Sequence, residues 1–423
     1  MSTPIGPDTP APERPRGWLT RGIAGVALSS LFSDTGHELT TSILPSLVTV
    51  TLHSTASALG LIEGISDGLM GLATLIAGPR ADEPESRLRL ASGGYLATAV
   101  ATGAIGLAAT VWQAGAFRAA AWLGRGVRSP ARDATLASLA SQDAHGRAFG
   151  LERAGDNLGA VAGPLLAAGL VAWLGVRPAL YLAAIPGVFA VFAITIAARE
   201  ARARAGTAAS PHRRRLRSQL HSVRAAGVAP LLLPIAAFEL GNMATTLLIL
   251  RATGLLRADG YSVAAATTLA VVVYAAHNLL ATIAAAAGGH WLDRRGSRAP
   301  FALGASLYVL SYLLFAVGGH GWLTLVPAFL LAGSGIGLAE TTESAVVAGA
   351  LPDALRGSAF GLLGGIRSLG ALTSSAIVGL LWTTVSPTAG FLYATGWMTV
   401  AALGSGALHM RLTSDADSGG GVA

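Results

Sequence analysis

Long apolar segments dominate the chain, and short polar stretches separate them. A helix that crosses a bilayer needs about 20 mostly apolar residues. Twelve segments have about that length, so the pattern predicts twelve transmembrane helices and an all-α membrane protein. Their approximate ranges are 20–48, 55–78, 90–110, 112–131, 148–173, 177–197, 229–250, 263–288, 299–318, 322–347, 359–382 and 387–409.

A basic stretch divides the predicted helices into two sets of six. Between Ala197 and Arg224 the chain carries eight arginines and one acidic residue. We interpret this stretch as a cytoplasmic linker between two pseudo-symmetric six-helix bundles. The predicted division is an N-terminal tail at 1–19, a bundle at 20–197, the linker at 198–228, a bundle at 229–409 and a C-terminal tail at 410–423.

The arginines outside the predicted helices lie mostly on one side of the membrane if both termini share that side. The loops on the opposite side hold only Arg177, Arg251 and Arg257. Because cytoplasmic loops carry an excess of basic residues, we expect both termini to be cytoplasmic and the protein to lie in the cell membrane. This topology and contact with anionic lipid explain the pI near 10.5. Membrane lipid is therefore a predicted partner, and nucleic acid is not.

The composition excludes several classes of protein. Only 12% of the residues are charged, whereas a soluble protein carries about 25%. The chain has no cysteine, which excludes thiolate metal sites and cysteine nucleophiles. Its basic residues are all arginines, and a Walker-type phosphate loop needs a lysine. We predict no enzymatic activity, no cofactor and no metal site.

A repeat relates the two predicted bundles. The sequence "GRAFGL" at 146–151 matches "GSAFGL" at 357–362, an offset of about 211 residues. Acidic residues, arginines or histidines occur in eight of the predicted helices, but the cores of 90–110, 177–197, 299–318 and 387–409 carry no charge. Every third helix is therefore uncharged, as expected if units of three helices repeat four times. Internal repeats of this kind are common in secondary transporters.

A loop motif follows the predicted helix at 263–288. Gly289, Asp293, Arg294, Gly296 and Arg298 form the pattern G-x-x-x-D-R-x-G-x-R. Glycine permits a tight turn, and the aspartate can pair with arginines or cap a neighbouring helix. We predict that this loop gates the cytoplasmic end; the alternative is an ordinary charged loop.

The corresponding loop of the first bundle is degenerate. It keeps Gly78, Asp82 and Arg87, but Glu83 stands where an arginine is usual. Asp82 is our candidate gating residue in this loop.

The loop motif, the twelve helices and the doubled halves resemble the major facilitator superfamily, over about 22–408. "SDTGHE" and "LGLIEGISDG" look like a bacterial branch of it. The resemblance implies two six-helix bundles around a central cavity lined by helices 1, 4, 7 and 10. It places these candidate substrate-binding residues along the cavity: His37, Arg118, Glu239, Asn242, Glu340 and Glu343.

Four carboxylates lie within the first two predicted helices. Asp34, His37 and Glu38 share one helical face, and Glu63 and Asp67 share one face of the next helix. We expect these groups to converge near the middle of the membrane. Four ionised carboxylates there would be costly, so some would keep a proton at neutral pH. We therefore predict that Asp34, Glu38, Glu63 and Asp67 couple proton movement; the alternative is a permanently paired structural network.

Other charged residues are candidates for a gate. Arg125, Arg128 and Arg132 repeat at helical spacing and face Glu152 and Asp156 at a similar depth. We predict a cytoplasmic cluster of these five residues that closes when the carrier faces outward. In the second half we expect Arg367 to stand opposite Glu340 and Glu343 as a latch, and a purely structural role is the alternative.

A run of glycines favours export. Gly155, Gly159 and Gly163 precede Pro164, which resembles the antiporter signature of superfamily exporters; simple helix packing is the alternative. We predict a monomeric proton-coupled exporter of a small organic molecule, cationic or neutral and amphiphilic. The alternatives are a proton-coupled importer of a nutrient or metal chelate and a non-transporting membrane receptor or scaffold.

Overall fold

The computed structural model describes residues 17–54, 56–205, 229–318 and 321–407, and every regular element in these ranges is helical. The fold is therefore all-α, as predicted. The N-terminal half comprises α1 (Arg21–Ser46), α2 (Ala56–Ala77), α3 (Pro84–Ala104), α4 (Val111–Leu139), α5 (His145–Leu174), α6 (Val176–Leu182) and α7 (Ala184–Ala205). The C-terminal half comprises α9 (Ala229–Gly241), α10 (Thr245–Ala258), α11 (Val263–Arg295), α12 (Arg298–Val317), α13 (Trp322–Ala350), α14 (Asp353–Thr384) and α15 (Pro387–Gly404). Short helical turns connect them at η1 (Leu47–Thr51), η2 (Gly78–Asp82), η3 (Ile105–Leu107), η4 (Gln142–Ala144) and η5 (Ser405–Ala407).

Within the described ranges, nine helical segments are long and apolar enough to cross a membrane. The total of twelve spans stays a prediction. Two predicted spans are broken. The segment at 177–197 becomes α6 and α7. The segment at 229–250 becomes α9 and α10, which the non-helical residues 242–244 separate.

Several helices extend beyond the predicted apolar segments. Helix α4 continues to Leu139 because Thr135, Leu136 and Ala137 at its end are buried against neighbouring helices. Helix α7 continues to Ala205, eight residues into the predicted linker. The remainder of that linker, 206–228, lies outside the described residues, as do 1–16 and 408–423 of the predicted tails.

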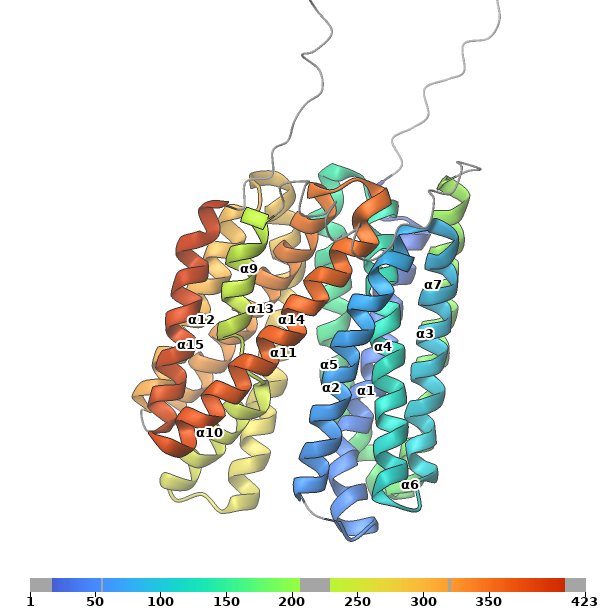
Figure 1. Cartoon of the computed structure of the whole chain (residues 1–423). Helices are drawn as coiled ribbons and strands as arrows, with labels where there is room; N and C mark the ends of the chain where they lie inside the picture. The colour runs from blue at the N-terminus through green and yellow to red at the C-terminus, as the bar shows by residue number, and fades with distance from the viewer. Residues whose placement is uncertain (1–16, 55, 206–228, 319–320, 408–423) are drawn as a thin grey trace, which may run out of the picture.

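Figure 1 shows the two halves side by side, with α1 beginning and α15 ending at the same end of the molecule. We call this end the terminal end. Helix α1 packs against α5 and α7, and α5 reaches across to contact α11 and α13 of the other half. Helix α14 makes the equivalent crossing to α2, η2 and α4. The ribbons of the halves converge toward the terminal end and diverge toward the far end (Figure 1).

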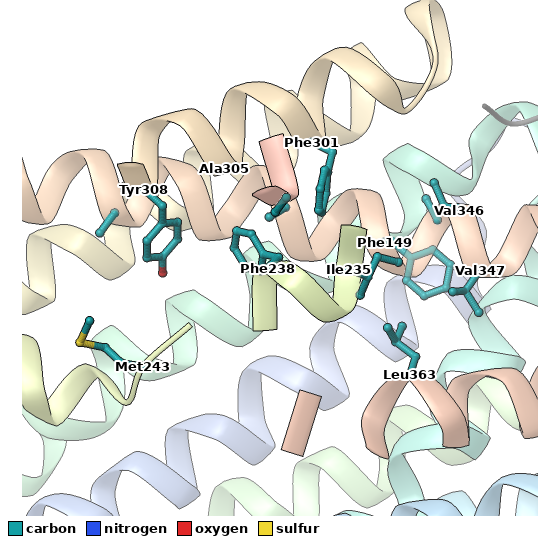
Figure 2. Packing of buried hydrophobic residues seen from close by; sticks show 14 of the residues in the cluster. Phe149, Ile235, Phe238, Met243, Phe301, Ala305, Tyr308, Val346, Val347 and Leu363 are labelled. Atoms are coloured by element: carbon teal, nitrogen blue, oxygen red, sulfur yellow. The ribbon is translucent and has the colours of Figure 1, made fainter. Parts of the chain in front are cut away.

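An apolar cluster joins the halves near the terminal end. Phe149 of α5 points toward Val346 and Val347 of α13 and Leu363 of α14 (Figure 2), and it is fully buried. Its ring centroid lies 5.7 Å from that of Phe360. Burying an aromatic ring contributes about 1.5–3 kcal/mol when the ring would otherwise meet water. This cluster therefore stabilises contact between the halves at the terminal end.

Candidate functional site

At the terminal end, Asp293 of α11 caps a helix of the other half. Its carboxylate accepts hydrogen bonds from Gly146 N at 2.6 Å and Arg147 N at 2.9 Å, and from Arg147 Nε at 2.7 Å. Gly146 and Arg147 lie in the first turn of α5, where backbone N–H groups have no partner within the helix. The structure thus shows the cap that the loop motif predicts. Gly296 of the motif ends α11 with φ +83°, and Arg294 and Arg298 are exposed.

Asp82 makes the corresponding contact from the first half. It accepts hydrogen bonds from Ser358 N at 2.9 Å and from Ser358 Oγ, in α14. Arg87 nearby pairs with Asp353 at 3.0 Å. The degenerate loop therefore keeps the inter-half contact, although Glu83 replaces the usual arginine.

Glycines bring the backbones of the two halves together beside these caps. A Cβ on Gly289 would overlap the carbonyl oxygen of Gly146, and a Cβ on Gly146 would overlap that of Gly289. Gly78 approaches Gly357 and Gly361 in the same way. The terminal end is therefore closed by two backbone crossings and two aspartate caps.

A central cavity lies between the halves, on the far side of this closure. Its volume is about 280 Å³. Helices α1 and α5 line one side, and α11, α12, α13, α14 and the break between α9 and α10 line the other. The lining includes four carboxylates, Asp34, Glu38, Asp156 and Glu340, and three rings, Tyr274, His277 and Tyr308; the described lining residues include no arginine.

Asp34 and Glu38 both line the cavity from α1, as their shared helical face predicts. Arg125 holds Asp34 with two bonds, Nη1 to Oδ1 at 2.8 Å and Nη2 to Oδ2 at 3.1 Å. For Glu38 the contact seen in the described part of the chain is 3.4 Å from Oε1 to Nε2 of His37, an ion pair only when that ring is protonated. Its side chain is 22% exposed, against 7% for Asp34. Glu38 is thus the less constrained of the two carboxylates.

Glycines explain how α1 and α5 approach closely enough to build this wall. Side chains at Gly159 and Gly163 of α5 would clash with the α1 backbone at Leu31 and Thr35. The glycine run therefore has a packing role in this structure.

Only two of the four carboxylates of the first two helices line the cavity, Asp34 and Glu38. Glu63 and Asp67 do not line the cavity; α2 packs against α4, and their partners lie there. Arg118 pairs with Glu63 at 3.0 Å, and Trp122 Nε1 donates to Asp67 at 2.6 Å. The Arg118 guanidinium lies 3.7 Å from the centroid of the Trp122 ring.

His37 and Arg118 also lie away from the cavity lining, contrary to their predicted place. The ring of His37 packs on Trp122 with centroids 4.3 Å apart, and Arg118 donates to Thr41 at 3.1 Å. Helix α4 therefore supports the cavity wall from behind, whereas α5 and α11 supply lining that the resemblance did not assign to them.

The predicted cluster on α4 lies within one half of the molecule. Arg132 pairs with Glu152 at 2.9 Å and with Asp133 at 2.8 Å. Arg128 donates to Ser33 Oγ at 2.8 Å and lies over the ring of Tyr95. In this conformation the pairs of Arg128 and Arg132 lie within the N-terminal half, and the gating role of the cluster stays a prediction. Asp156 of the predicted cluster lines the cavity instead.

In the second half, Arg367 pairs with Glu343 at 2.8 Å, as predicted, and approaches Glu239 to 3.6 Å. Asn242 Nδ2 donates to Glu239 at 3.1 Å. Glu239 and Glu343 are buried behind the cavity, whereas Asn242 and Glu340 line it. The carboxylate of Glu340 does not pair with Arg367. The contact between these two residues is a hydrogen bond from Arg367 Nη2 to the backbone oxygen of Glu340.

Arg153 is a functional candidate that the sequence analysis did not propose. Its Nη1 lies 3.6 Å from Asp156 Oδ2 and 3.6 Å from Glu340 Oε2, so it joins α5 to α13 across the two halves. The available signal was the run "ERAGD", in which one arginine lies between two acidic residues. Tyr274 and Tyr308 were also absent from the candidates, because aromatic residues in an apolar helix give no distinct signal; His277, the ionisable residue of its predicted helix, was interpreted as a packed polar group, and it lines the cavity.

Comparisons with known proteins agree on the family. A sequence profile described as Major Facilitator Superfamily matches residues 26–375. An uncharacterized protein of Mycobacterium tuberculosis is 30% identical over 387 residues, which cover 89% of each chain. An uncharacterized MFS-type transporter of Methanocaldococcus jannaschii is 24% identical, over 89% of this chain and 92% of its own. A bacterial homologue of the iron transporter ferroportin, solved in an outward-facing state, has a TM-score of 0.72 at 15% identity, covering 92% of this chain and 99% of its own.

Proposed function

This chain belongs to the major facilitator superfamily, and we propose that it is a proton-coupled carrier that exports small organic cations by alternating access. Membership makes it a multi-pass membrane protein of a transporter family. The substrate class, the proton coupling and the direction are our proposals, and each has its own support.

The observation that carries the proposal is the central cavity with its one-sided closure. The cavity lies between the halves, and both aspartate caps lie between it and the terminal end. Alternating access requires a site that two gates expose in turn. If the termini are cytoplasmic, this conformation faces outward.

The charges of the lining support a cationic substrate. Four carboxylates line the cavity, while Arg125 and Arg153 contact them from outside the lining. Tyr274 and Tyr308 add ring surface on which an organic cation can stack. A volume of about 280 Å³ suits a small molecule.

Glu38 is the carboxylate best placed to exchange a proton. A proton carrier must be accessible in turn to each side and must not be fixed in a permanent pair. Asp34 is held by two arginine bonds, whereas the contact seen for Glu38 among the described residues is 3.4 Å long, and its side chain is partly exposed in the cavity. A proton and an organic cation would then compete for the carboxylate of Glu38. Binding of one would release the other, as an exporter driven by proton exchange requires.

A test of the substrate class uses the full chain in liposomes and labelled organic cations, anions and neutral compounds of similar size. We expect uptake of cations, and we expect Glu340→Gln to weaken it roughly tenfold, as for the loss of one charge-assisted contact. Asp143→Asn is the matched control, because that carboxylate is 81% exposed at the terminal end. Uptake of anions alone, or equal loss in both variants, would refute the proposed class.

A further inference from the structure

A second cavity lies at the terminal end, away from the central one. Its volume is about 210 Å³. The polar residues that line it include Arg87, Ser138, Arg202, Arg204, Asp353 and Arg356, and we call it the arginine pocket. We propose that the arginine pocket binds a phosphate-bearing anion that holds the two halves together at this end.

The pocket is built from both halves. Helices α3, α4 and α7 of the N-terminal half form most of the wall. Asp353 and Arg356, in the first turn of α14, complete it from the C-terminal half. Arg356 Nη1 also donates to Ala137 O of α4 at 3.0 Å, so the two sides are already in contact.

Three arginines of the pocket keep donors that an anion can use. Arg356 uses Nε for Ala348 O and Nη1 for Ala137 O and Asp353, and no bond from its Nη2 is seen in the described part of the chain. Arg204 uses Nη1 for Leu139 O and Nη2 for Glu200, and among the described residues no partner of its Nε is seen. Arg202 has one contact of 3.5 Å with Glu85, and its side chain is 57% exposed.

The fourth arginine is structural. Arg87 donates from Nε to Ala81 O, from Nη1 to Asp353 Oδ1 and from Nη2 to the backbone oxygens of Asp82 and Asp353. It positions Asp353, and these four bonds already use four of its five N–H donors.

The acidic groups near the pocket are occupied. Asp353 is shared by Arg87 and Arg356. Glu200 accepts from Gly22 N at 2.6 Å and from Arg204. Glu85 is 63% exposed beside Arg202. The lining contains four arginines and one carboxylate, so the pocket is positively charged. A planar guanidinium can also donate two parallel hydrogen bonds to the oxygens of a phosphate group.

Binding here would favour the closed terminal end. Arg356 belongs to one half, and Arg202 and Arg204 belong to the other, so the complete donor set exists only while the halves are in contact. A ligand that binds one conformation better shifts the equilibrium toward it. The phosphate can come from a lipid headgroup or from a soluble phosphate, since both present the same oxygens.

The test measures binding and conformation without any substrate. The chain has no cysteine, so spin labels can be attached at Gln142→Cys and Ala299→Cys, two exposed positions on opposite halves at the terminal end. The distance distribution is recorded in phosphatidylcholine vesicles with or without phosphatidylglycerol, and separately with inorganic phosphate or pyrophosphate. Sodium chloride matches the ionic strength of every sample.

We expect one of the two phosphate sources to increase the closed population. The double variant Arg202→Gln with Arg204→Gln should reduce the apparent affinity at least roughly tenfold, because it removes charge-assisted bonds. Arg199→Gln is the matched control, since Arg199 is exposed on the same helix and does not line the pocket. A response to phosphatidylglycerol alone identifies a lipid headgroup, and a response to free phosphate identifies a soluble ligand.

Two results would overturn the proposal. One is a closed population that neither source changes. The other is an equal loss of response in the control and in the double variant, which would indicate general surface charge. Because no substrate is present, failure of this proposal leaves the transport proposal untouched.

Discussion

At the scale of single residues, the protein buries many arginines with their carboxylate partners. Glu152 is fully buried and is held by Arg132 at 2.9 Å and by Ser30 Oγ at 2.6 Å. Burying two charges is costly, and only good geometry offsets the cost of desolvation. Such pairs therefore fix the packing of α1, α4 and α5 around Asp34 more than they add to net stability.

Removing one partner of this pair should be strongly destabilising. Arg132→Leu removes the closer of the two arginines that contact Glu152 and leaves only Arg153 at 3.4 Å, and we expect unfolding to become easier by about 3–5 kcal/mol. Arg202→Gln breaks a pair whose side chains are more than half exposed, and its effect should stay below about 1 kcal/mol. Denaturant titration in detergent compares the two; equal effects would show that Arg132 and Glu152 are not a buried pair.

At the scale of helices, two crossings decide whether the terminal end closes. One is between α5 and α11, and the other is between η2 and α14. The crossings occupy repeat-related positions, since Gly78 and Gly289 are separated by the same offset of about 211 residues as Gly146 and Gly357. Each has an aspartate cap beside it. The same local geometry thus occurs twice, with the roles of the two halves exchanged.

A methyl group at this crossing should oppose closure. Gly289→Ala puts a Cβ against the Gly146 carbonyl, so we expect the distance between labels at Gln142→Cys and Ala299→Cys to lengthen. Gly169→Ala on α5 is the control, because a Cβ there meets no atom within 4 Å. An unchanged distance in Gly289→Ala would show that the crossing tolerates a side chain.

The sequence predicts the helical elements better than it predicts their side-chain partners. Apolar length locates the described helices, and the loop motif locates the Asp293 cap. The break between α9 and α10 has no apolar signature, yet it places Asn242 in the cavity lining. Helical spacing correctly puts Asp34 and Glu38 on one face. It cannot show that α2 turns Glu63 and Asp67 toward Arg118 and Trp122, because rotation of a helix depends on its neighbours.

At the scale of the whole molecule, closure at one end should alternate with closure at the other. Labels at Ala109→Cys and Val385→Cys report the far end, and both positions are exposed on opposite halves. We expect conditions that lengthen the terminal-end distance to shorten this one, since a carrier must not open at both ends. Independent changes of the two distances would contradict alternating access.

The central claim is that a cation and a proton compete in the cavity at Glu38, and proton flux tests it most directly. Liposomes with an acidic interior and an internal pH dye receive an external organic cation, and a labelled cation reports its own exchange. We expect the cation to drive protons out in the wild type and in Asp143→Asn. In Glu38→Gln we expect cation exchange to continue without proton movement. Full proton coupling in Glu38→Gln, or cation transport that never moves protons in the wild type, would contradict the account.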